Sequence, residues 1–126
     1  MKELKLCANL GQSWIVRNMN FNDFKMVQRV MSNSNVVVNM CGPRRKIKHK
    51  KDFEEVNINV ARKVARAARL NPEVLRLIHF SAVGASPDSP SLDLQTKYWG
   101  EQAVLEEFPN ATIIRPTTVR HILVLF

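Results

Sequence analysis

Short apolar runs alternate along the chain with longer segments in which apolar residues recur every three or four positions. The clearest run is Val36, Val37 and Val38, which is followed by Asn39 and Gly42. Consecutive β-branched residues without polar alternation predict a strand buried on both faces, as in a parallel sheet covered by helices. Ligands of such sheets lie beyond the carboxyl ends of the strands, which places Asn39 and Gly42 at an expected ligand site. The alternative is a plain core strand followed by a turn glycine.

Three other short apolar runs also predict strands. They cover residues 14–19, 74–80 and 111–115. Gly11 marks a turn before the first of these runs, and Pro116 ends the last because proline has no amide hydrogen to donate. The chain is therefore expected to contain about four strands, separated by segments long enough for helices.

Apolar residues at helical spacing predict a first and a last helix. Asp23 suits the N-cap of the first, because its short side chain can accept a hydrogen bond from a free backbone amide. The last helix is expected over residues 94–108, after a loop rich in Gly, Pro and Ser. The expected apolar stripes are Phe24, Val27, Val30 and Met31 in the first helix, and Leu94, Tyr98, Leu105 and Phe108 in the last.

A middle helix is expected to begin near Phe53, because Asp52 and Glu55 have the spacing of a capping box. Asn71 and Pro72 end it. Its buried face is expected at Val56, Val60, Ala61, Val64, Ala65 and Ala68. Strands and helices then alternate as βαβαβαβ, which predicts an α/β fold with a parallel, doubly wound sheet. With 126 residues, the chain is expected to form a single domain, 1–126.

The net charge of +8 raises the question of an anionic partner. Six of the positive residues follow Gly42 in one run: Arg44, Arg45, Lys46, Lys48, Lys50 and Lys51. Without aromatic residues among them, a stacking platform for single-stranded nucleic acid is disfavoured. A solvated loop and a contact with phosphate or an acidic surface both remain open.

The cysteines and the apolar stretches exclude several classes of protein. Cys7 and Cys41 form no Cys-x-x-Cys pair and have no histidine at metal-ligand spacing, which argues against a zinc site or a disulfide framework. The longest apolar stretches are the length of a strand, and no transit peptide opens the chain. We therefore expect no metal site and no membrane-spanning segment.

With these elements placed, the chain resembles the atypical, extended, epimerase-like group of the short-chain dehydrogenase/reductase family. Within it, the chain is most similar to the nucleotide-binding accessory subunits of mitochondrial complex I. The matching stretches cover roughly residues 9 to 119. They are residues 9–12 (Asn-Leu-Gly-Gln), 34–39 with Gly42, 52–58, 77–82, Lys97 with Gly100 and Glu101, 108–111 and 114–116.

The resemblance implies a partial Rossmann-like domain that binds NAD(P). The family opens with a strand and a Gly-x-x-Gly-x-x-Gly turn that holds the dinucleotide pyrophosphate at a helix N-terminus. This chain has no such turn, and its glycines are scattered at 11, 42, 84 and 100. The first two family strands are therefore expected to be missing, and the chain to be a fragment that binds the cofactor weakly by itself.

The resemblance also implies that the family's chemistry is lost. Active relatives use a Tyr-x-x-x-Lys pair, in which the lysine lowers the tyrosine pKa so that the phenolate can exchange a proton with the substrate. Lys97 fits the lysine position, but Asp93 stands where the tyrosine would be. An aspartate is ionised near neutral pH and cannot donate that proton. The serine that helps to polarise the substrate in active relatives is replaced by Val83. Tyr98 is next to Lys97 but lies about 100° around the helix axis from it, on a different face.

The resemblance still implies part of a nucleotide-binding surface. It implies that Asn20 lies by the adenine and that Asn57 contributes from the next helix. The other implied contacts are Asn39, Met40 and Gly42 on the adenosine and pyrophosphate side, and Ser81, Lys97 and Pro116 on the nicotinamide side. A solvated lysine is the alternative interpretation of Lys97. The ribose-reading segment is absent, so NAD and NADP are not distinguished.

The function implied by the resemblance is a non-catalytic accessory or assembly subunit of mitochondrial complex I, or a fragment of one. It would bind other complex I subunits on the matrix side of the inner membrane, with positive surface facing anionic lipid head groups. The rival hypothesis is an NAD(P)-dependent epimerase/dehydratase or reductase in truncated form. A nucleic-acid-binding module is a third, which rests on charge alone.

Overall fold

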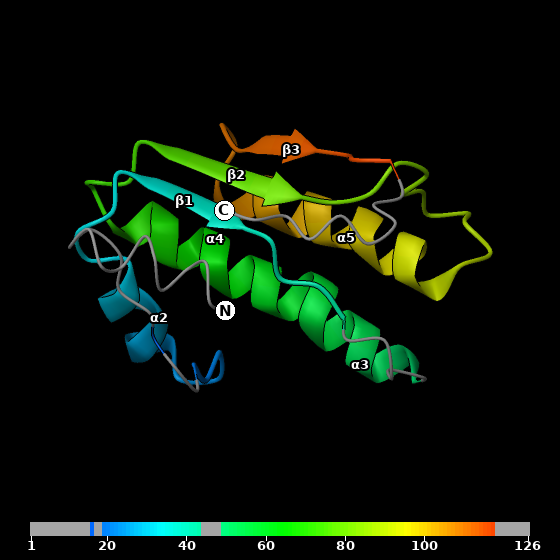
Figure 1. Ribbon diagram of the computed structural model, residues 1–126, viewed down its shortest axis with the longest axis horizontal. Coiled ribbons are helices and arrows are strands. Elements are labelled where there is room, and N and C mark those ends of the chain that lie inside the picture. The colour runs from blue at the N-terminus through cyan, green and yellow to red at the C-terminus, as the bar shows by residue number, and fades with distance from the viewer. Residues whose placement is uncertain (1–15, 17–18, 44–48, 118–126) are drawn as a thin grey trace, which may run out of the picture.

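The computed structural model describes residue 16 and residues 19–43 and 49–117 (Figure 1). Within these ranges the chain forms a three-stranded parallel sheet in the order β1-β2-β3. The strands are β1 (Val36–Asn39), β2 (Arg76–Phe80) and β3 (Thr112–Ile114). The predicted parallel α/β fold is confirmed. The strand expected at 14–19 falls mainly outside the described ranges, and Val16 and Met19 are not in a strand.

Helices connect the strands in the predicted order. Between β1 and β2 a continuous helical segment contains α3 (Lys50–Glu54), the π-helical stretch η1 (Glu55–Val60) and α4 (Ala61–Leu70). Helix α5 (Leu92–Glu107) connects β2 to β3. Both α4 and α5 lie on the same side of the sheet, below it in Figure 1. Right-handed crossovers between adjacent parallel strands produce this arrangement.

The short helix α2 (Phe24–Val30) precedes β1 and packs against α4. Its start is the predicted one, because the Asp23 side chain accepts a hydrogen bond from the Met26 amide at 3.2 Å. Val27 and Met31 are buried as expected, whereas Val30 is exposed. The N-cap thus fixes where the helix begins. Fewer apolar side chains than predicted pack against α4.

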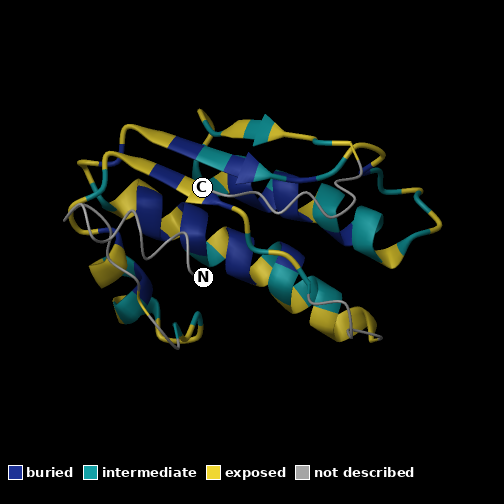
Figure 2. Ribbon diagram, viewed as in Figure 1, coloured by how far each residue is buried: buried dark blue, intermediate teal, exposed yellow. Residues whose placement is uncertain are grey.

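The hydrophobic core lies between the sheet and its helices. Leu77 and Val37 contribute from the strands, Val64 from α4 and Val104 from α5, and all are buried. In Figure 2 the buried residues line the surfaces where the sheet and helices face each other. The burial of these apolar side chains, each worth about 1.5–3 kcal/mol, is the main stabilising contribution.

The other face of the sheet corrects one prediction. Val36 and Val38 were expected to be buried, because the run predicted a strand covered on both faces, but they are 50% and 49% exposed. Their exposure follows from the position of α4 and α5 on one side only, since no element among residues 19–43 and 49–117 lies on the other. Among the described residues, helices therefore cover one face of the sheet.

The middle helix also begins earlier than predicted. His49, in an extended conformation, is its N-cap, so Asp52 lies inside α3 and the predicted capping box does not form. The π-helical stretch then changes which side chains face the core. Asn57 is buried, whereas Val56, which was expected on the buried face, is only half-buried. An extra residue in the helical turn rotates the following side chains around the axis, which accounts for the shift.

The buried side of α5 is not the predicted one either. The large residues expected to face inward, Leu94, Tyr98, Leu105 and Phe108, are all only half-buried. Apart from Glu101, the buried residues of α5 are small or medium-sized: Thr96, Gly100, Ala103 and Val104. A Cβ atom at Gly100 would overlap the backbone carbonyl of Asn57. The helix backbones of α5 and η1 therefore approach each other too closely for large side chains.

Candidate functional site

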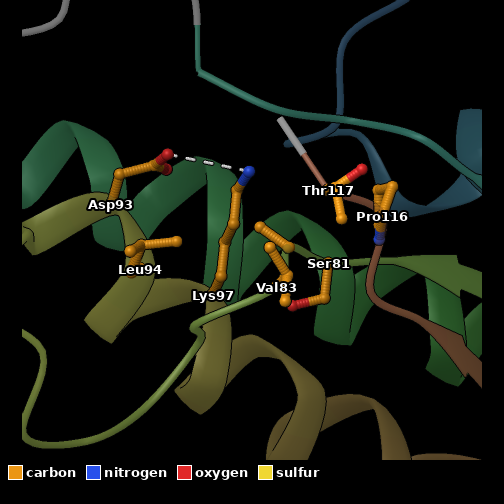
Figure 3. A pocket seen from close by; sticks show the side chains of 8 residues that line it. Ser81, Val83, Asp93, Leu94, Lys97, Pro116 and Thr117 are labelled. Atoms are coloured by element: carbon orange, nitrogen blue, oxygen red, sulfur yellow. Dashed lines mark ion pairs between the residues drawn. The ribbon is translucent and has the colours of Figure 1, made fainter. Parts of the chain in front are cut away.

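A pocket of about 380 Å³ lies where β2 and β3 end and α5 begins. The carboxyl ends of parallel strands are the usual place for a ligand in such sheets. Figure 3 shows the side chains around it, with Asp93 and Lys97 across from Pro116 and Thr117. The lining residues are Ser81, Ala82, Val83, Asp93, Leu94, Lys97, Pro116 and Thr117.

Backbone hydrogen bonds position one wall of this pocket. The Ser81 amide donates to the Ile114 carbonyl at 2.8 Å, and the Val83 amide donates to the Pro116 carbonyl at 2.9 Å. The segment after β3 is thereby held beside the segment after β2. Pro116 ends the strand as predicted, and Thr117 follows it into the pocket wall.

The first turns of α5 form the opposite wall, where Asp93 is held from two sides. The Lys97 ammonium lies 3.6 Å from its Oδ2 atom, which is the ion pair drawn in Figure 3. The Asn57 side-chain amide of η1 donates to its Oδ1 atom at 3.0 Å. The same amide donates to the Thr96 hydroxyl at 2.9 Å. A carboxylate engaged in this way accepts hydrogen bonds and serves as the counter-ion of Lys97.

Ser81 has a hydroxyl group that finds no partner among the described residues. The residue is 5% exposed, and its Oγ atom is buried without a hydrogen bond. An unpaired buried hydroxyl costs about 1–3 kcal/mol, which a ligand in the pocket would recover by pairing with it. Two residues further on, Val83 offers no hydroxyl and is 51% exposed. Ser81, Lys97 and Thr117 are therefore lining residues whose hydroxyl or ammonium groups face a ligand in this pocket.

A second polar group lies at the carboxyl ends of β1 and β2, on the face toward the helices. The Asn39 side-chain oxygen accepts from the Cys41 amide at 3.1 Å, which turns its NH₂ group toward His79 Nδ1, also at 3.1 Å. Nδ1 therefore accepts this hydrogen bond, and the ring proton lies on Nε2. Burial lowers the pKa of His79, against an opposing effect of Glu101 and with a smaller lowering by Lys97. Burial also raises the pKa of the Cys41 thiol.

The structure brings together only some of the predicted site residues. Ser81, Lys97 and Pro116 line one pocket, and Asn57 contacts its wall through Asp93. The Asn39 side chain is instead satisfied by its neighbours, and a Cβ atom at Gly42 would meet nothing within 4 Å. Met40 is exposed.

Asn20 lies outside the pocket, in the exposed turn before α2, where its side chain accepts from the Asn22 amide at 3.0 Å. Thr96 and Thr117 were not predicted as site residues. Its place directly after the proline that ends a strand is the signal from which Thr117 could have been predicted.

The fit of a dinucleotide can be judged from these groups. The unpaired Ser81 hydroxyl and the Lys97 ammonium suit the polar end of a ligand in the pocket. The described residues contain no glycine-rich turn that would hold a pyrophosphate. They also contain no three His, Cys, Asp or Glu side chains placed to hold a metal ion. No described helix is long and apolar enough to cross a membrane.

No family model matches the chain. It is 38% identical over 120 residues to NADH dehydrogenase (ubiquinone) 1 alpha subcomplex subunit 9 of Arabidopsis thaliana, covering 94% of this chain and 29% of the relative. The Mus musculus protein of the same name is 36% identical over 120 residues, covering 92% and 30%. The NADH-ubiquinone oxidoreductase 40 kDa subunit of Neurospora crassa is 32% identical over 115 residues, covering 91% and 30%. The chain spans less than a third of the length of these mitochondrial relatives.

Solved structures show the same fold. A UDP-glucuronic acid 4-epimerase of Bacillus cereus in complex with NAD gives a TM-score of 0.71 at 16% identity, covering 91% of this chain and 44% of the other. A dTDP-4-dehydrorhamnose reductase of Bacillus anthracis in complex with NADP gives 0.67 at 20% identity, covering 92% and 49%. The resemblance predicted from the sequence, to complex I subunits on an epimerase-like Rossmann scaffold, is confirmed.

Proposed function

We propose that this chain is part of a non-catalytic, NAD(P)-binding-like accessory subunit of mitochondrial respiratory complex I. The observation that carries the proposal is the similarity along 94% of the chain to a complex I subunit, at 38% identity. Residues 1–126 would then form a single partial Rossmann-like domain of that subunit, on the matrix side of the inner membrane. Other complex I subunits would be its partners.

The pocket supports a role without catalysis. Asp93 stands where active relatives of the family have a proton-donating tyrosine, and both its oxygens are engaged by Asn57 and Lys97. Val83 replaces the serine that would polarise a substrate. A substrate carbonyl in this pocket would therefore meet no donor in the place of that tyrosine, and Lys97 is a remnant of the catalytic pair.

A bound dinucleotide would have a structural role in this proposal. NAD or NADP would offer its nicotinamide end to Ser81, Lys97 and Pro116, where the free Ser81 hydroxyl could pair with it. Asn20, Asn39, Met40, Gly42 and Asn57 are assigned to the rest of the cofactor by resemblance. Because the Asn39 and Asn57 side chains already have partners, their contribution would be to shape the surface.

The positive charge of the chain suits a position near the inner membrane. Lys50 and Lys51 are exposed at the start of α3, and the net charge is +8. Basic residues near an anionic membrane surface each contribute about 1 kcal/mol of attraction. We propose that this end of the basic run contacts anionic lipid head groups.

The alternative is a piece of an NAD(P)-dependent epimerase or reductase. It is favoured by the solved structures of similar fold, which are enzymes of these kinds with NAD or NADP bound. The two functions predict different binding partners in the cell, since only the accessory role requires the chain to be bound to complex I. A tagged chain purified from detergent-solubilised mitochondria should migrate with NADH:ubiquinone oxidoreductase activity on a native gel. A chain that reaches mitochondria but migrates apart from that activity would refute the accessory role.

A further inference from the structure

A groove of about 200 Å³ lies between α2 and α4, which pack against each other (Figure 1). Among the described residues, it shares no lining residue with the pocket at the ends of β2 and β3. Its volume is below the roughly 300–1,000 Å³ of sites that enclose a whole small molecule, so it suits a single side chain. The lining residues are Phe24, Asn59, Arg62, Lys63, Arg66 and Glu107.

Arg66 differs from the other two cations of the groove in its partners. Arg62 and Lys63 each pair with a glutamate at 3.3 Å. The Arg66 guanidinium lies instead over the Phe24 ring, 5.7 Å from its centroid, and no carboxylate among the described residues pairs with it. A guanidinium has five N–H donors in one plane, and stacking on a ring leaves the donors at its edge free. Arg66 can therefore donate two parallel hydrogen bonds to a carboxylate that enters the groove.

Positive charge is concentrated on the two helices that form the groove. Helix α2 contains two basic residues and α4 contains four, and neither helix contains an aspartate or a glutamate. Outside the ranges that the structure describes, the sequence contains one side-chain carboxylate, Glu3, and eight lysines or arginines. Those segments would add positive charge to the groove and not neutralise it. An acidic occupant would therefore come from another molecule.

The carboxylates beside the groove distinguish between kinds of anionic molecule. Glu55, Glu106 and Glu107 lie 3.1–3.3 Å from basic side chains of α4. A nucleic acid or an anionic membrane carries closely spaced negative charges, which these carboxylates would repel. A protein segment can place one carboxylate between them, and the methylene groups of a glutamate can pack beside the Phe24 ring.

We propose that this groove binds a glutamate side chain from an acidic segment of another protein, with Arg66 as the main hydrogen-bond donor. The pairs of Arg62 and Lys63 do not prevent this. Their side chains and those of their glutamate partners are 32% to 67% exposed, and ion pairs so exposed contribute at most about 1 kcal/mol, so they rearrange readily. The inference rests on the geometry and charge of the groove and not on the proposed function.

The test uses the full chain and a short, fluorescently labelled peptide of alternating Glu and Leu residues. Fluorescence anisotropy should give a dissociation constant of about 100 μM or below. Arg66→Gln should weaken binding about tenfold, because a bidentate, charge-assisted pair is lost. Arg66→Lys should also weaken it, by about threefold or more, since an ammonium keeps the charge but lacks the planar fork.

Arg76→Gln is the matched control, because it removes the same charge elsewhere. Arg76 is exposed at the start of β2, and alternation along the strand places it on the face of the sheet opposite α4 and α5. Its effect on binding should stay within about twofold, since salt screens a distant surface charge. A second control peptide, with Gln in place of Glu, should not bind. Circular dichroism should first show that the three variants keep the wild-type spectrum.

Four results would overturn the inference. They are an absence of binding at about 1 mM peptide, an order of magnitude above the expected constant, equal weakening by Arg66→Gln and Arg76→Gln, equal binding of the Gln peptide, and unchanged binding by Arg66→Lys. Retention on phosphatidylserine vesicles or on duplex DNA that is lost in Arg66→Gln and kept in Arg76→Gln would also overturn it, by assigning the groove to those anions. Specific peptide binding by a chain that does not accompany complex I would leave this inference standing and refute the proposed function.

Discussion

The Asn57 side chain on η1 and the Asp93 carboxylate on α5 are joined by a hydrogen bond of 3.0 Å. Because the Lys97 ammonium lies 3.6 Å from the other oxygen, the carboxylate is held between two helical segments and one cation. Asp93 therefore connects η1 to α5, at the position that the resemblance assigns to the proton donor of active relatives.

Catalytic inactivity is the first prediction. The purified chain should show no NAD(P)H-dependent reductase or epimerase turnover, because by resemblance Asp93 stands in place of the tyrosine that exchanges a proton and Val83 in place of the serine that polarises the substrate. Asp93→Tyr alone should restore none, since a glycine-rich phosphate turn is still missing from the sequence. Absorbance at the NAD(P)H band measures reductase turnover, and chromatographic separation of the two epimers measures epimerase turnover, because an epimerase returns its cofactor unchanged. Turnover that disappears in Lys97→Ala, or turnover gained in Asp93→Tyr, would show that the site has been misassigned.

Gly100 should be intolerant of any side chain. A Cβ atom there would overlap the Asn57 carbonyl, so Gly100→Ala must separate α5 from η1. We expect a loss of about 1–3 kcal/mol in the free energy of unfolding, as for other overpacked sites. Gly42→Ala is the control, since its Cβ atom meets nothing within 4 Å, and should stay within about 0.5 kcal/mol. Urea denaturation of both variants gives the comparison, and equal effects would contradict the close approach of the helices.

His79 should make stability depend on pH. Its pKa in the folded chain is lowered from the ordinary 6.5, chiefly by burial, so as the pH falls the unfolded chain takes up a proton first. The free energy of unfolding should therefore be unaffected above about pH 7 and should decrease from about pH 6.5 downward. The slope is at most about 1.4 kcal/mol per pH unit until the folded chain also binds the proton.

Denaturation of the wild type and of His79→Gln at pH 7.5 and 5.5 measures this dependence. The variant should lose part of the decrease, because its amide does not titrate. His49→Gln is a suitable control, since His49 is exposed at the N-cap of α3. A decrease that persists unchanged in His79→Gln would assign it to other groups.

Where the sequence predicted the fold correctly, the signal was local. The Asp23 cap and the strand-ending Pro116 act through their own backbone neighbours, so their effects can be read from residue type and spacing. The inner side of α5 depends instead on how closely another helix approaches. The sequence did not predict that small residues such as Gly100 face inward. They do so because the π-helical stretch η1 packs directly against them, and this contact cannot be read from the sequence of α5 alone.

The candidate site was predicted unevenly for the same reason. Ser81, Lys97 and Pro116 converge because each lies at the end of a strand or the start of a helix, which the topology brings together. Asn39 also lies at a strand end, but its side chain turns to His79, across a strand pairing that spacing alone does not reveal. The order of strands and helices along the sequence indicates which segments contribute to a site. The pairing of the strands decides which neighbours a side chain at a strand end contacts.

Replacing Arg115 should destabilise the chain, because the buried Glu101 carboxylate would lose its partner. The Glu101 side chain is 4% exposed and accepts two hydrogen bonds from the guanidinium, at 2.9 and 2.7 Å. Arg115→Ala leaves that buried carboxylate unpaired, which should cost about 1–3 kcal/mol. Arg62→Ala breaks a pair with Glu106 whose side chains are 50% and 67% exposed, and should cost less than about 1 kcal/mol. Thermal unfolding that ranks the two variants in the opposite order would contradict the burial of Glu101.

The central claim is that the protein serves complex I without catalysing a reaction of its own. The most direct test deletes it from cells and measures complex I assembly and NADH:ubiquinone oxidoreductase activity after return of the wild type or of the double variant Asp93→Asn, Lys97→Met. These near-isosteric changes remove the charges of the Asp93 and Lys97 side chains and keep most of their volume. We predict that the double variant restores assembly and activity as well as the wild type does. Failure of a folded, stably expressed double variant, or normal complex I in cells that lack the protein, would contradict the account.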